Sequence, residues 1–166
     1  MKNVLFVCTG NTCRSPLAEV LFRDLAKQAG GYEVGSAGVG AFSGQAASRH
    51  SVTLARELGL DLSRHKSRAV TVDLVEKATH IFVMGRSHLS AVLSSHPDAE
   101  DKVYLVSEFA ADDRLRGRDL CDPFGGDLAD YRETLEHLQK MLPSVLAYIE
   151  QTWKDEEAGR GRQQGD

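Results

Sequence analysis

The chain has 166 residues, 42% of them hydrophobic, which is enough to bury the core of one globular domain. Its formal net charge of −4 gives no reason to expect nucleic acid as a partner. The apolar run behind Met1 is too short for a signal peptide, and no later segment is apolar for long enough to span a bilayer, so we expect a cytoplasmic protein with no membrane partner.

The first half of the chain alternates between strand and helix patterns. Apolar runs indicate strands, apolar residues at helical spacing indicate helices, and glycine pairs indicate stops. In chain order these signals predict a strand at residues 3–7, a helix at 16–29 stopped by Gly30-Gly31, a strand at 32–39, a loop at 38–45, and helices at 46–58 and 71–78.

The second half continues this alternation and ends in a long helix. In chain order the sequence predicts a strand at residues 80–84, a helix at 87–95, a strand at 103–106, a turn-rich stretch at 110–126 and a helix at 128–153. Pro143 lies inside the last helix, where it could bend the axis. Residues 154–166 are polar and lack periodicity, which predicts a disordered tail.

Alternation of this kind is typical of a single α/β domain in which helices cover both faces of a parallel sheet. Functional sites in such domains lie at the carboxyl ends of the strands. The first strand ends near Val7, so the loop that follows it is the first candidate site.

Residues 8–15 read Cys-Thr-Gly-Asn-Thr-Cys-Arg-Ser and join the first predicted strand to the first predicted helix. Pro16 suits the first turn of a helix because proline has no amide hydrogen to leave unpaired. The free N–H groups and the dipole of a helix N-terminus favour an oxyanion such as phosphate and lower the pKa of a nearby thiol. Arg14 adds a planar guanidinium that can hold two phosphate oxygens. The loop therefore predicts a cysteine nucleophile in an anion-binding site.

The polar residues of this loop suit phosphate chemistry. The Cys8 thiolate can attack phosphorus and form a phosphocysteine that water later hydrolyses, while Arg14 holds the oxygens as charge shifts in the transition state. Gly10 is expected to let the loop turn so that consecutive amides face the anion. Ser15 can hydrogen-bond the Cys8 sulfur, and Asn11 can hold the loop through bonds to the backbone. The alternative is a turn that contains a buried structural cysteine.

The segment from Cys8 to Pro16 resembles the signature of the low-molecular-weight protein tyrosine phosphatase family. Three further stretches agree with it: Ser36-Ala37-Gly38, residues 59–65, and Asp122-Pro123-Phe124-Gly125. The likeness runs from residue 2 to residue 153, which indicates a phosphatase domain over residues 1–153. It implies a four-stranded parallel sheet in the order 2-1-3-4, flanked by helices on both faces, with the phosphate loop after the first strand.

The resemblance also implies roles for individual residues. Cys8 would be the nucleophile, Arg14 the phosphate ligand and Asp122 the general acid. The other residues that it marks are those expected to bind the substrate, namely Thr9, Gly10, Asn11, Thr12, Cys13 and Phe124, and those expected to support the loop, namely Ser15, Ser36 and His65.

Asp122 fits the role of general acid on chemical grounds as well. A leaving group expelled from phosphorus needs a proton, and a carboxyl group near the thiolate on a proline-stiffened loop can supply it. The same group can then activate water against the phosphocysteine. By itself an Asp-Pro pair indicates only a turn.

Position 12 bears on the choice of substrate. Tyrosine-directed members of the family carry an apolar residue there and aromatic residues after Asp-Pro, whereas this chain has Thr12, and Phe124 is followed by two glycines. This combination resembles the bacterial protein arginine phosphatases. A phosphoarginine guanidinium is planar, cationic and rich in donors, and the Thr12 hydroxyl and the Asp122 carboxylate could accept its hydrogen bonds. The alternative is that Thr12 only packs, in a tyrosine phosphatase of broad specificity.

Two other classes of protein remain open. Thiol-dependent arsenate reductases share this loop, but their electron relay needs further cysteines after the third strand, and residues 76–97 contain none. Cys121 is better explained as a small apolar side chain. A non-catalytic phosphate-binding module would not need the Cys8 thiol.

The chain has three cysteines, an odd number without a secretory context, which predicts free thiols. Cys13 is near enough to Cys8 in the loop to capture an oxidised Cys8 as a reversible disulfide, which would make the protein redox-sensitive. The alternative is a packed thiol. The six histidines show no metal-ligand spacing and no dinucleotide-binding fingerprint occurs, so we expect no metal and no cofactor. The expected partners are phosphorylated proteins, and the sequence does not indicate an oligomeric state.

Overall fold

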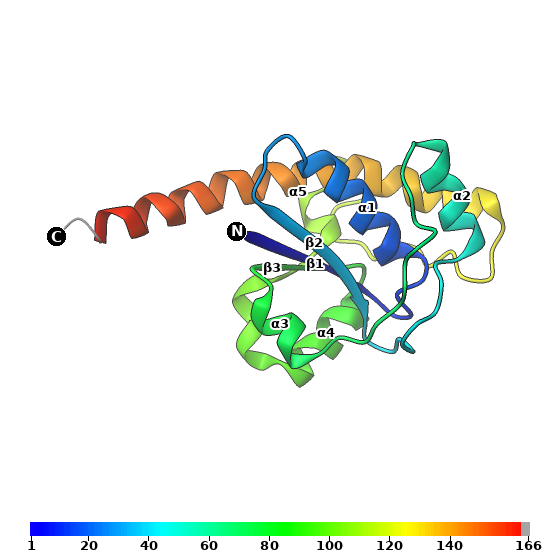
Figure 1. Ribbon diagram of the computed structural model, residues 1–166, viewed down its shortest axis with the longest axis horizontal. Helices are drawn as coiled ribbons and strands as arrows, with labels where there is room; N and C mark the ends of the chain where they lie inside the picture. Colours follow the sequence, from blue (N-terminus) through cyan, green and yellow to red (C-terminus); the bar gives the residue numbers. More distant parts are fainter. Residues whose placement is uncertain (164–166) are drawn as a thin grey trace.

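We describe the fold from a computed structural model of the chain, which describes residues 1–163 and the side chains of residues 1–153. At its centre lies a four-stranded, all-parallel sheet in the order β2-β1-β3-β4 (Figure 1). The predicted α/β class, parallel sheet and strand order are confirmed. The strands are β1 (Lys2–Cys8), β2 (Tyr32–Gly38), β3 (His80–Val83) and β4 (Val103–Leu105).

β1 is a central strand because its sequence is apolar on both faces. Val4 and Phe6 belong to the core on one side of the sheet, and Leu5 and Val7 belong to the core on the other. β1 pairs with β2 on one side and with β3 on the other. A strand with two partners and two buried faces has a fixed register, and this fixes the position of Cys8 at its end.

Helices cover both faces of the sheet (Figure 1). Every predicted strand and helix is present, with ends shifted by at most three residues except at the C-terminal end of α5. One face carries α1 (Arg14–Ala26), α2 (Arg49–Glu57) and α5 (Leu128–Gln163), and against α5 also packs the 3₁₀ helix η2 (Val106–Phe109). The other face carries α3 (Val72–Lys77), α4 (Arg86–Ser95) and the 3₁₀ helix η1 (Pro97–Lys102).

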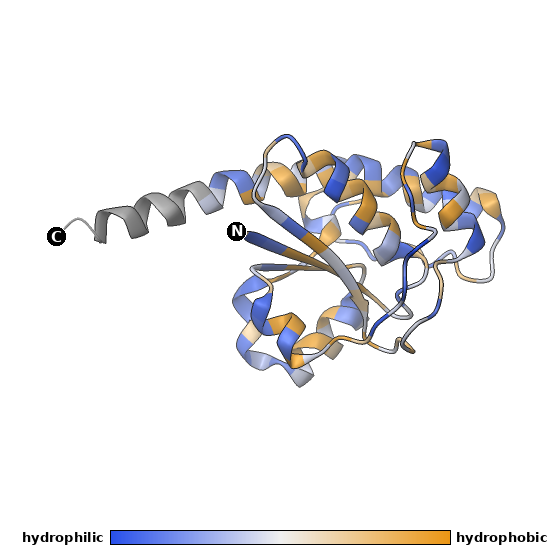
Figure 2. Ribbon diagram, viewed as in Figure 1, coloured by the Kyte–Doolittle hydropathy of each residue, from blue (hydrophilic) through white to orange (hydrophobic). Residues whose placement is uncertain are grey.

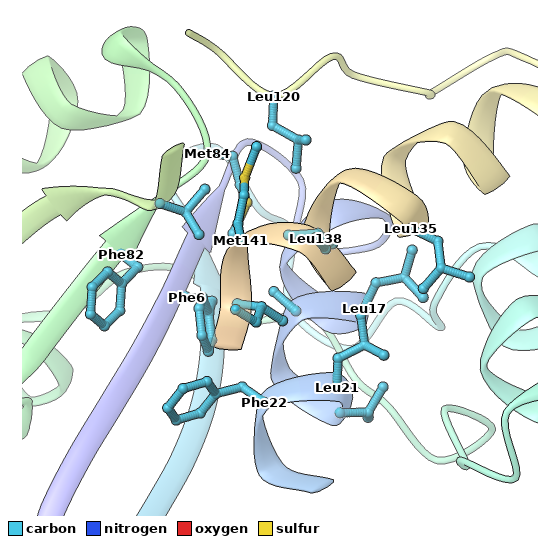
Figure 3. Close-up of a cluster of buried hydrophobic side chains, with 14 of the residues drawn as sticks. Phe6, Leu17, Leu21, Phe22, Phe82, Met84, Leu120, Leu135, Leu138 and Met141 are labelled. Carbon is cyan, nitrogen blue, oxygen red and sulfur yellow. The ribbon is translucent and has the colours of Figure 1, made fainter. Parts of the chain in front are cut away.

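The larger core lies between the sheet and the helices α1 and α5 (Figure 3). Phe6 reaches it from β1 and Phe22 from α1, and their rings meet edge to face at a centroid distance of 5.5 Å. Leu138 and Met141 approach from α5. Full burial of one such side chain stabilises the fold by about 1.5–3 kcal/mol. Figure 2 shows hydrophobic and hydrophilic residues alternating along α1 and the first part of α5, as expected for helices with one buried face.

Two short elements were not predicted. Residues 97–102 form η1, in which Pro97 occupies the first turn with Asp98 behind it, a helix-start signal within a segment that is otherwise polar. The fourth strand ends at Leu105, one residue before the predicted end, because Val106 begins η2.

The end of α5 differs from the prediction. Where the sequence predicts a disordered tail from residue 154, α5 continues through Pro143 and past Trp153 to Gln163. A helix that is already nucleated extends at little cost into residues 154–158, which include lysine, glutamate and alanine of high helix propensity, whereas Gly159 and Gly161 each cost about 1 kcal/mol. Residues 164–166, the rest of the predicted tail, lie outside the described residues.

Residues 67–70 run along the outer edge of β2, and we call them the edge segment. The backbone N–H of Gly38 donates to the Arg68 carbonyl at 2.9 Å, and the N–H of Val70 donates to the Gly38 carbonyl at 3.1 Å. The Arg68 side chain donates from Nε to the Ser36 carbonyl at 2.9 Å. The edge segment thereby covers the carboxyl end of β2 and approaches the loop after β1.

Candidate active site

Residues 8–15 connect β1 to α1 at the carboxyl edge of the sheet, and we call them the cysteine loop. Unpaired N–H groups before the first turn of a helix attract an anion. The loop therefore has the donors that an oxyanion requires. Within the part of the chain that the structure describes, no acceptor binds the backbone N–H groups of Thr9, Gly10, Thr12, Cys13 and Arg14.

Cys8 is almost completely buried, with 3% of its surface exposed. Its Sγ lies 2.9 Å from Ser15 Oγ, and the backbone N–H of Asn11 donates to Sγ at 3.3 Å. The Ser15 hydroxyl accepts a hydrogen bond from Asn11 Nδ2 at 2.8 Å, so its own hydrogen can be donated to the sulfur. Two donors directed at the sulfur stabilise the thiolate form that a nucleophile needs.

Asn11 lies beneath the cysteine loop and holds it in place. It is fully buried, and its Nδ2 donates to Ser15 Oγ and, at 2.9 Å, to Ser36 Oγ. Its Oδ1 accepts the backbone N–H of Arg68 at 3.0 Å. Its carbonyl accepts a hydrogen bond from His65 Nε2 at 2.7 Å. These bonds join the loop to β2, to the edge segment and to the chain before it.

The sharp turn of the loop is at Asn11 and not at Gly10, where the sequence places it. Asn11 has a φ of 57°, in the left-handed region, whereas Gly10 is absent from the positions with positive φ. Asparagine tolerates this conformation better than most residues. The glycine that the loop needs is Gly38 of β2, because a Cβ there would lie 2.4 Å from the Thr9 carbonyl oxygen and 3.0 Å from Asn11 N.

Arg14 connects the cysteine loop to the segment that carries Asp122. Its side chain is buried, and Nη1 donates to the Leu120 carbonyl at 2.9 Å. Its Nη2 lies 3.5 Å from Asp122 Oδ2. Arg14 is therefore the first residue of α1, and its guanidinium also holds the Asp122 carboxylate.

Asp122 lies in residues 117–124, which we call the acid segment. Its side chain is 49% exposed, and Oδ1 accepts the backbone N–H of Phe124 at 3.1 Å. Leu120 anchors the segment, because its side chain is buried in the core and its N–H donates to the Met84 carbonyl at 2.8 Å. The acid segment thus has two buried residues, Leu120 and Pro123, among neighbours that are mostly exposed.

The cysteine loop and the acid segment face a common pocket of about 360 Å³. Phe42 and Phe124 stand at its mouth, with 75% and 77% of their surfaces exposed. Exposed aromatic rings on two separate loops give the mouth flat apolar surfaces. The pocket is lined by Cys8, Thr9, Gly10, Thr12, Cys13, Arg14, Gly40, Phe42, Gln45, Asp122 and Phe124.

The structure brings the predicted site residues together but divides them into two groups. Those that line the pocket are Cys8, Thr9, Gly10, Thr12, Cys13, Arg14, Asp122 and Phe124. Asn11, which the sequence groups with the substrate-binding residues, lies behind the loop, as do the expected supporting residues Ser15, Ser36 and His65. Ser36 continues the support outward by donating to Glu19 Oε1 at 2.8 Å.

The sequence motifs do not identify several residues that the structure places at the site. Phe42 and Gln45 lie in the loop that the sequence predicts after β2, but no motif marked them. His88 of α4 lies with Nε2 2.8 Å from Thr9 Oγ1, and its Nδ1 is buried without a partner among the described residues. Burial, and secondarily the charge of Arg14, lower the pKa of His88 to about 4, which keeps this ring neutral near pH 7.

The three cysteines are free thiols, as predicted. Cys13 is buried, and its Sγ lies 3.3 Å from the hydroxyl oxygen of Tyr131. Burial, and then this contact with Cys13, raise the pKa of Tyr131. Cys121 is exposed beside Asp122.

Among the described residues, every helix is too short or too polar to span a membrane. The histidine, cysteine, aspartate and glutamate side chains in that part of the chain do not gather in any group of three or more that could hold a metal ion.

Known proteins with similar sequences cover most of this chain. The sequence profile described as "Low molecular weight phosphotyrosine protein phosphatase" matches residues 3–156. A protein-arginine-phosphatase from Geobacillus stearothermophilus is 37% identical over 147 residues, which cover 89% of this chain and 95% of that protein. A probable low molecular weight protein-tyrosine-phosphatase, EpsP, from Ralstonia nicotianae is 34% identical over 149 residues, which cover 90% of this chain and 97% of that protein.

The fold is also found among solved structures. A mutant of the YwlE arginine phosphatase with a phosphorylated active-site serine is 34% identical to this chain and matches it with a TM-score of 0.81. The match covers 89% of this chain and 95% of that one.

Proposed function

Because this chain belongs to the low molecular weight phosphotyrosine protein phosphatase family, we propose that it is a cysteine-dependent protein phosphatase that removes phosphate from phosphoarginine in proteins. The observation that carries the proposal is the placement of the Cys8 sulfur, the free amides of the cysteine loop, Arg14 and Asp122 around one pocket. The name of the Geobacillus relative supports the choice of phosphoarginine.

The reaction proceeds in two steps at Cys8. In the first, the thiolate attacks phosphorus, the P–N bond of phosphoarginine breaks, and Asp122 gives its proton to the departing guanidine nitrogen. In the second, Asp122 takes a proton from water as the water oxygen attacks phosphorus, the P–S bond breaks, and inorganic phosphate leaves. Ser15 and the Asn11 amide stabilise the sulfur as it departs. The solved relative with a phosphorylated active-site serine supports a covalent phosphoenzyme.

Arg14 and the loop amides supply the charge stabilisation. Phosphoryl transfer spreads negative charge over the equatorial oxygens, and fixed donors around them lower the barrier. The unpaired N–H groups between Thr9 and Arg14 suit those oxygens. Arg14 is held at Leu120 and Asp122, so its guanidinium is oriented before the substrate arrives.

Thr12 supports the preference for phosphoarginine. It lines the pocket, and among the residues with described side chains its hydroxyl contacts one polar atom, Cys13 Sγ at 3.7 Å, so its oxygen can accept an N–H from a guanidinium. Asp122 offers a second acceptor on the other side of the pocket. Phe42 and Phe124 present ring faces at the mouth, against which a planar cation can stack.

The test is the ratio of kcat/KM on phosphoarginine and phosphotyrosine peptides of the same sequence. We expect the parent protein to favour phosphoarginine and Thr12→Ile to reverse the preference, because isoleucine removes the acceptor and makes the pocket wall apolar. Thr12→Ser keeps the hydroxyl and should keep the preference. If the parent protein and Thr12→Ile both favour phosphotyrosine, the assignment to phosphoarginine is wrong.

A tyrosine phosphatase is the second candidate. The name of the Ralstonia relative and the description of the family profile favour it, and the apolar rings of Phe42 and Phe124 could also bind a phenyl group. The same peptide assay decides between the two substrates.

We also propose that Cys13 makes the enzyme redox-sensitive in a cytoplasmic setting. Both thiols are buried in one short loop, so a sulfenic acid formed by peroxide on Cys8 can be attacked by the Cys13 thiol, with loss of water and formation of a disulfide. Activity lost to peroxide should then return on addition of a thiol in the parent protein and not in Cys13→Ala. If the parent protein does not recover, the switch does not exist.

A further inference from the structure

The first turn of α4 lies between the two halves of the site. α4 begins with Gly85 as its N-cap and Arg86 as its first residue, at the carboxyl end of β3 (Figure 1). Gly85 has no side chain, so it cannot cap the helix itself. The N-terminal amides of α4 need acceptors from elsewhere in the chain.

Asp119 of the acid segment supplies such an acceptor. Its Oδ1 accepts the backbone N–H of Arg86 at 2.9 Å, and Arg86 Nη2 donates to the Gly117 carbonyl at 2.9 Å. A carboxylate at this place also interacts favourably with the helix dipole. Two hydrogen bonds, both donated by Arg86, thus fasten the acid segment to α4, one of them three residues before Asp122.

The packing at Gly85 shows that the carboxylate occupies a fitted position. A Cβ on Gly85 would lie 3.2 Å from Asp119 Cγ and 3.3 Å from its Oδ1. The φ of Gly85 is −160°, an extended conformation that any residue adopts. A side chain at position 85 would therefore displace Asp119 by a few tenths of an ångström, whereas the backbone conformation itself suits any residue.

The same turn of α4 also holds the cysteine loop. His88 is 3% exposed, and its Nε2 lies 2.8 Å from Thr9 Oγ1. Arg86 and His88 belong to one helical turn, so the contact with the acid segment and the contact with the cysteine loop have a fixed spacing.

From this geometry we infer that Asp119 is a positioning residue, which sets the distance of Asp122 from the departing atom by fastening the acid segment to the first turn of α4. The inference rests on the proposed role of Asp122 as general acid. Asp119 itself does not line the pocket and does not touch the substrate. Its loss should weaken proton donation and leave nucleophilic attack unchanged.

The experiment compares kcat/KM on two aryl phosphates, phenyl phosphate and p-nitrophenyl phosphate. This parameter reports the steps up to departure of the leaving group. Phenolate needs a proton to leave, whereas p-nitrophenolate leaves without one. Weaker proton donation by the general acid therefore lowers kcat/KM on phenyl phosphate only. We expect Asp119→Ala to lower kcat/KM on phenyl phosphate by about fivefold, the effect of losing one cap, and on p-nitrophenyl phosphate by less than about twofold.

Two further variants test the contact itself. Asp119→Asn keeps an oxygen that can accept the Arg86 N–H, so it should restore most of the value on phenyl phosphate. Gly85→Ala keeps the Asp119 side chain, but the added Cβ displaces its carboxylate. This variant should therefore reproduce the selective loss of kcat/KM on phenyl phosphate. Asp113→Ala, which removes an exposed carboxylate paired with Arg116 at 2.7 Å, is the matched control and should change neither value.

Asp122→Asn separates this inference from the proposed function. If Asp122→Asn shows no dependence on the leaving group, Asp122 is not the general acid and the proposed mechanism fails. If Asp122→Asn shows the dependence but Asp119→Ala lowers both values equally or lowers neither, Asp119 has only a structural role or none, and the inference is overturned.

Discussion

The cysteine loop and the acid segment face the same pocket, but the protein holds them in different ways. Cys8, Asn11 and Ser15 are buried and are bonded to one another, to β2 and to the edge segment. Asp122 is half exposed, and its segment is held at Leu120 and by the hydrogen bonds that Arg86 donates to Asp119 and Gly117. The proposed nucleophile, Cys8, is thus built into the core, whereas the proposed acid, Asp122, is attached to the core at a few points.

This difference separates two kinds of effect. A change beneath the cysteine loop disturbs buried hydrogen bonds, so it should affect stability and every substrate together. A change in the acid segment disturbs few buried contacts, so it should affect proton donation or substrate choice while the fold persists.

Cys8→Ser should abolish turnover of either phosphorylated substrate, by at least about 10³-fold in kcat, because a serine hydroxyl is not ionised by the donors that stabilise a thiolate. Circular dichroism and thermal unfolding should show an intact fold, since the two side chains differ little in size. Cys121→Ser, outside the pocket lining, is the control and should stay active. Turnover retained in Cys8→Ser would remove the covalent mechanism.

Asn11→Ala should lower the free energy of unfolding by about 2–4 kcal/mol, because it leaves the buried partners Ser15 and Ser36 and the Arg68 amide without their hydrogen bonds. Denaturant titration measures this. Asn11→Gly loses the same bonds but adopts a φ of 57° without strain, so it should be less destabilised than alanine by about 1 kcal/mol. Equal stability of the two variants would show that the turn is unstrained.

The protein should lose stability as the pH falls from about 6.5 to about 4, because burial is the main cause that lowers the pKa values of His80 and His88 to about 4. The unfolded chain binds more protons than the folded one in this window, so acid favours unfolding. The loss should be on the order of 2 kcal/mol for each histidine. Urea titrations across the window should show a shallower pH dependence in His88→Asn than in the parent protein.

Asp113→Ala should change the free energy of unfolding by less than about 0.5 kcal/mol, although it breaks the ion pair with Arg116. Both side chains are largely exposed, at 86% and 50%, and water screens their attraction. Thermal unfolding at low and high salt measures the effect. A loss above about 1 kcal/mol would show that the exposed chain just before the acid segment is held more firmly than an exposed ion pair explains.

The sequence predicts the local parts of the site better than the distant ones. Cys8, Arg14 and Ser15 are found because a strand end, a loop and a helix start lie together in one short stretch. Asp122 is found through the resemblance to a family, since an Asp-Pro pair alone indicates a turn. The contacts that no local pattern reveals join distant parts of the chain: His88 to Thr9 and Arg14 to Leu120.

In the fold, too, local features are predicted from the sequence better than features that depend on distant contacts. The alternation of strands and helices predicts a parallel sheet with two covered faces, and the structure confirms it. The sequence predicts the sharp turn at Gly10, because glycine is the usual residue for a positive φ. The structure has it at Asn11, and the hydrogen bonds of the asparagine side chain explain why Asn11 takes that conformation. Tertiary contacts, which a local sequence pattern does not contain, decide such positions.

The edge segment at residues 67–70 connects activity with resistance to aggregation. An uncovered strand edge is a template on which another chain can pair, and the edge segment occupies that place on β2 at Gly38. The N–H of Arg68 in the same segment holds Asn11, and through it the nucleophile. Displacement of Arg68 would therefore both expose the edge of β2 and release Asn11, so aggregation and loss of activity should occur together in variants that move this segment.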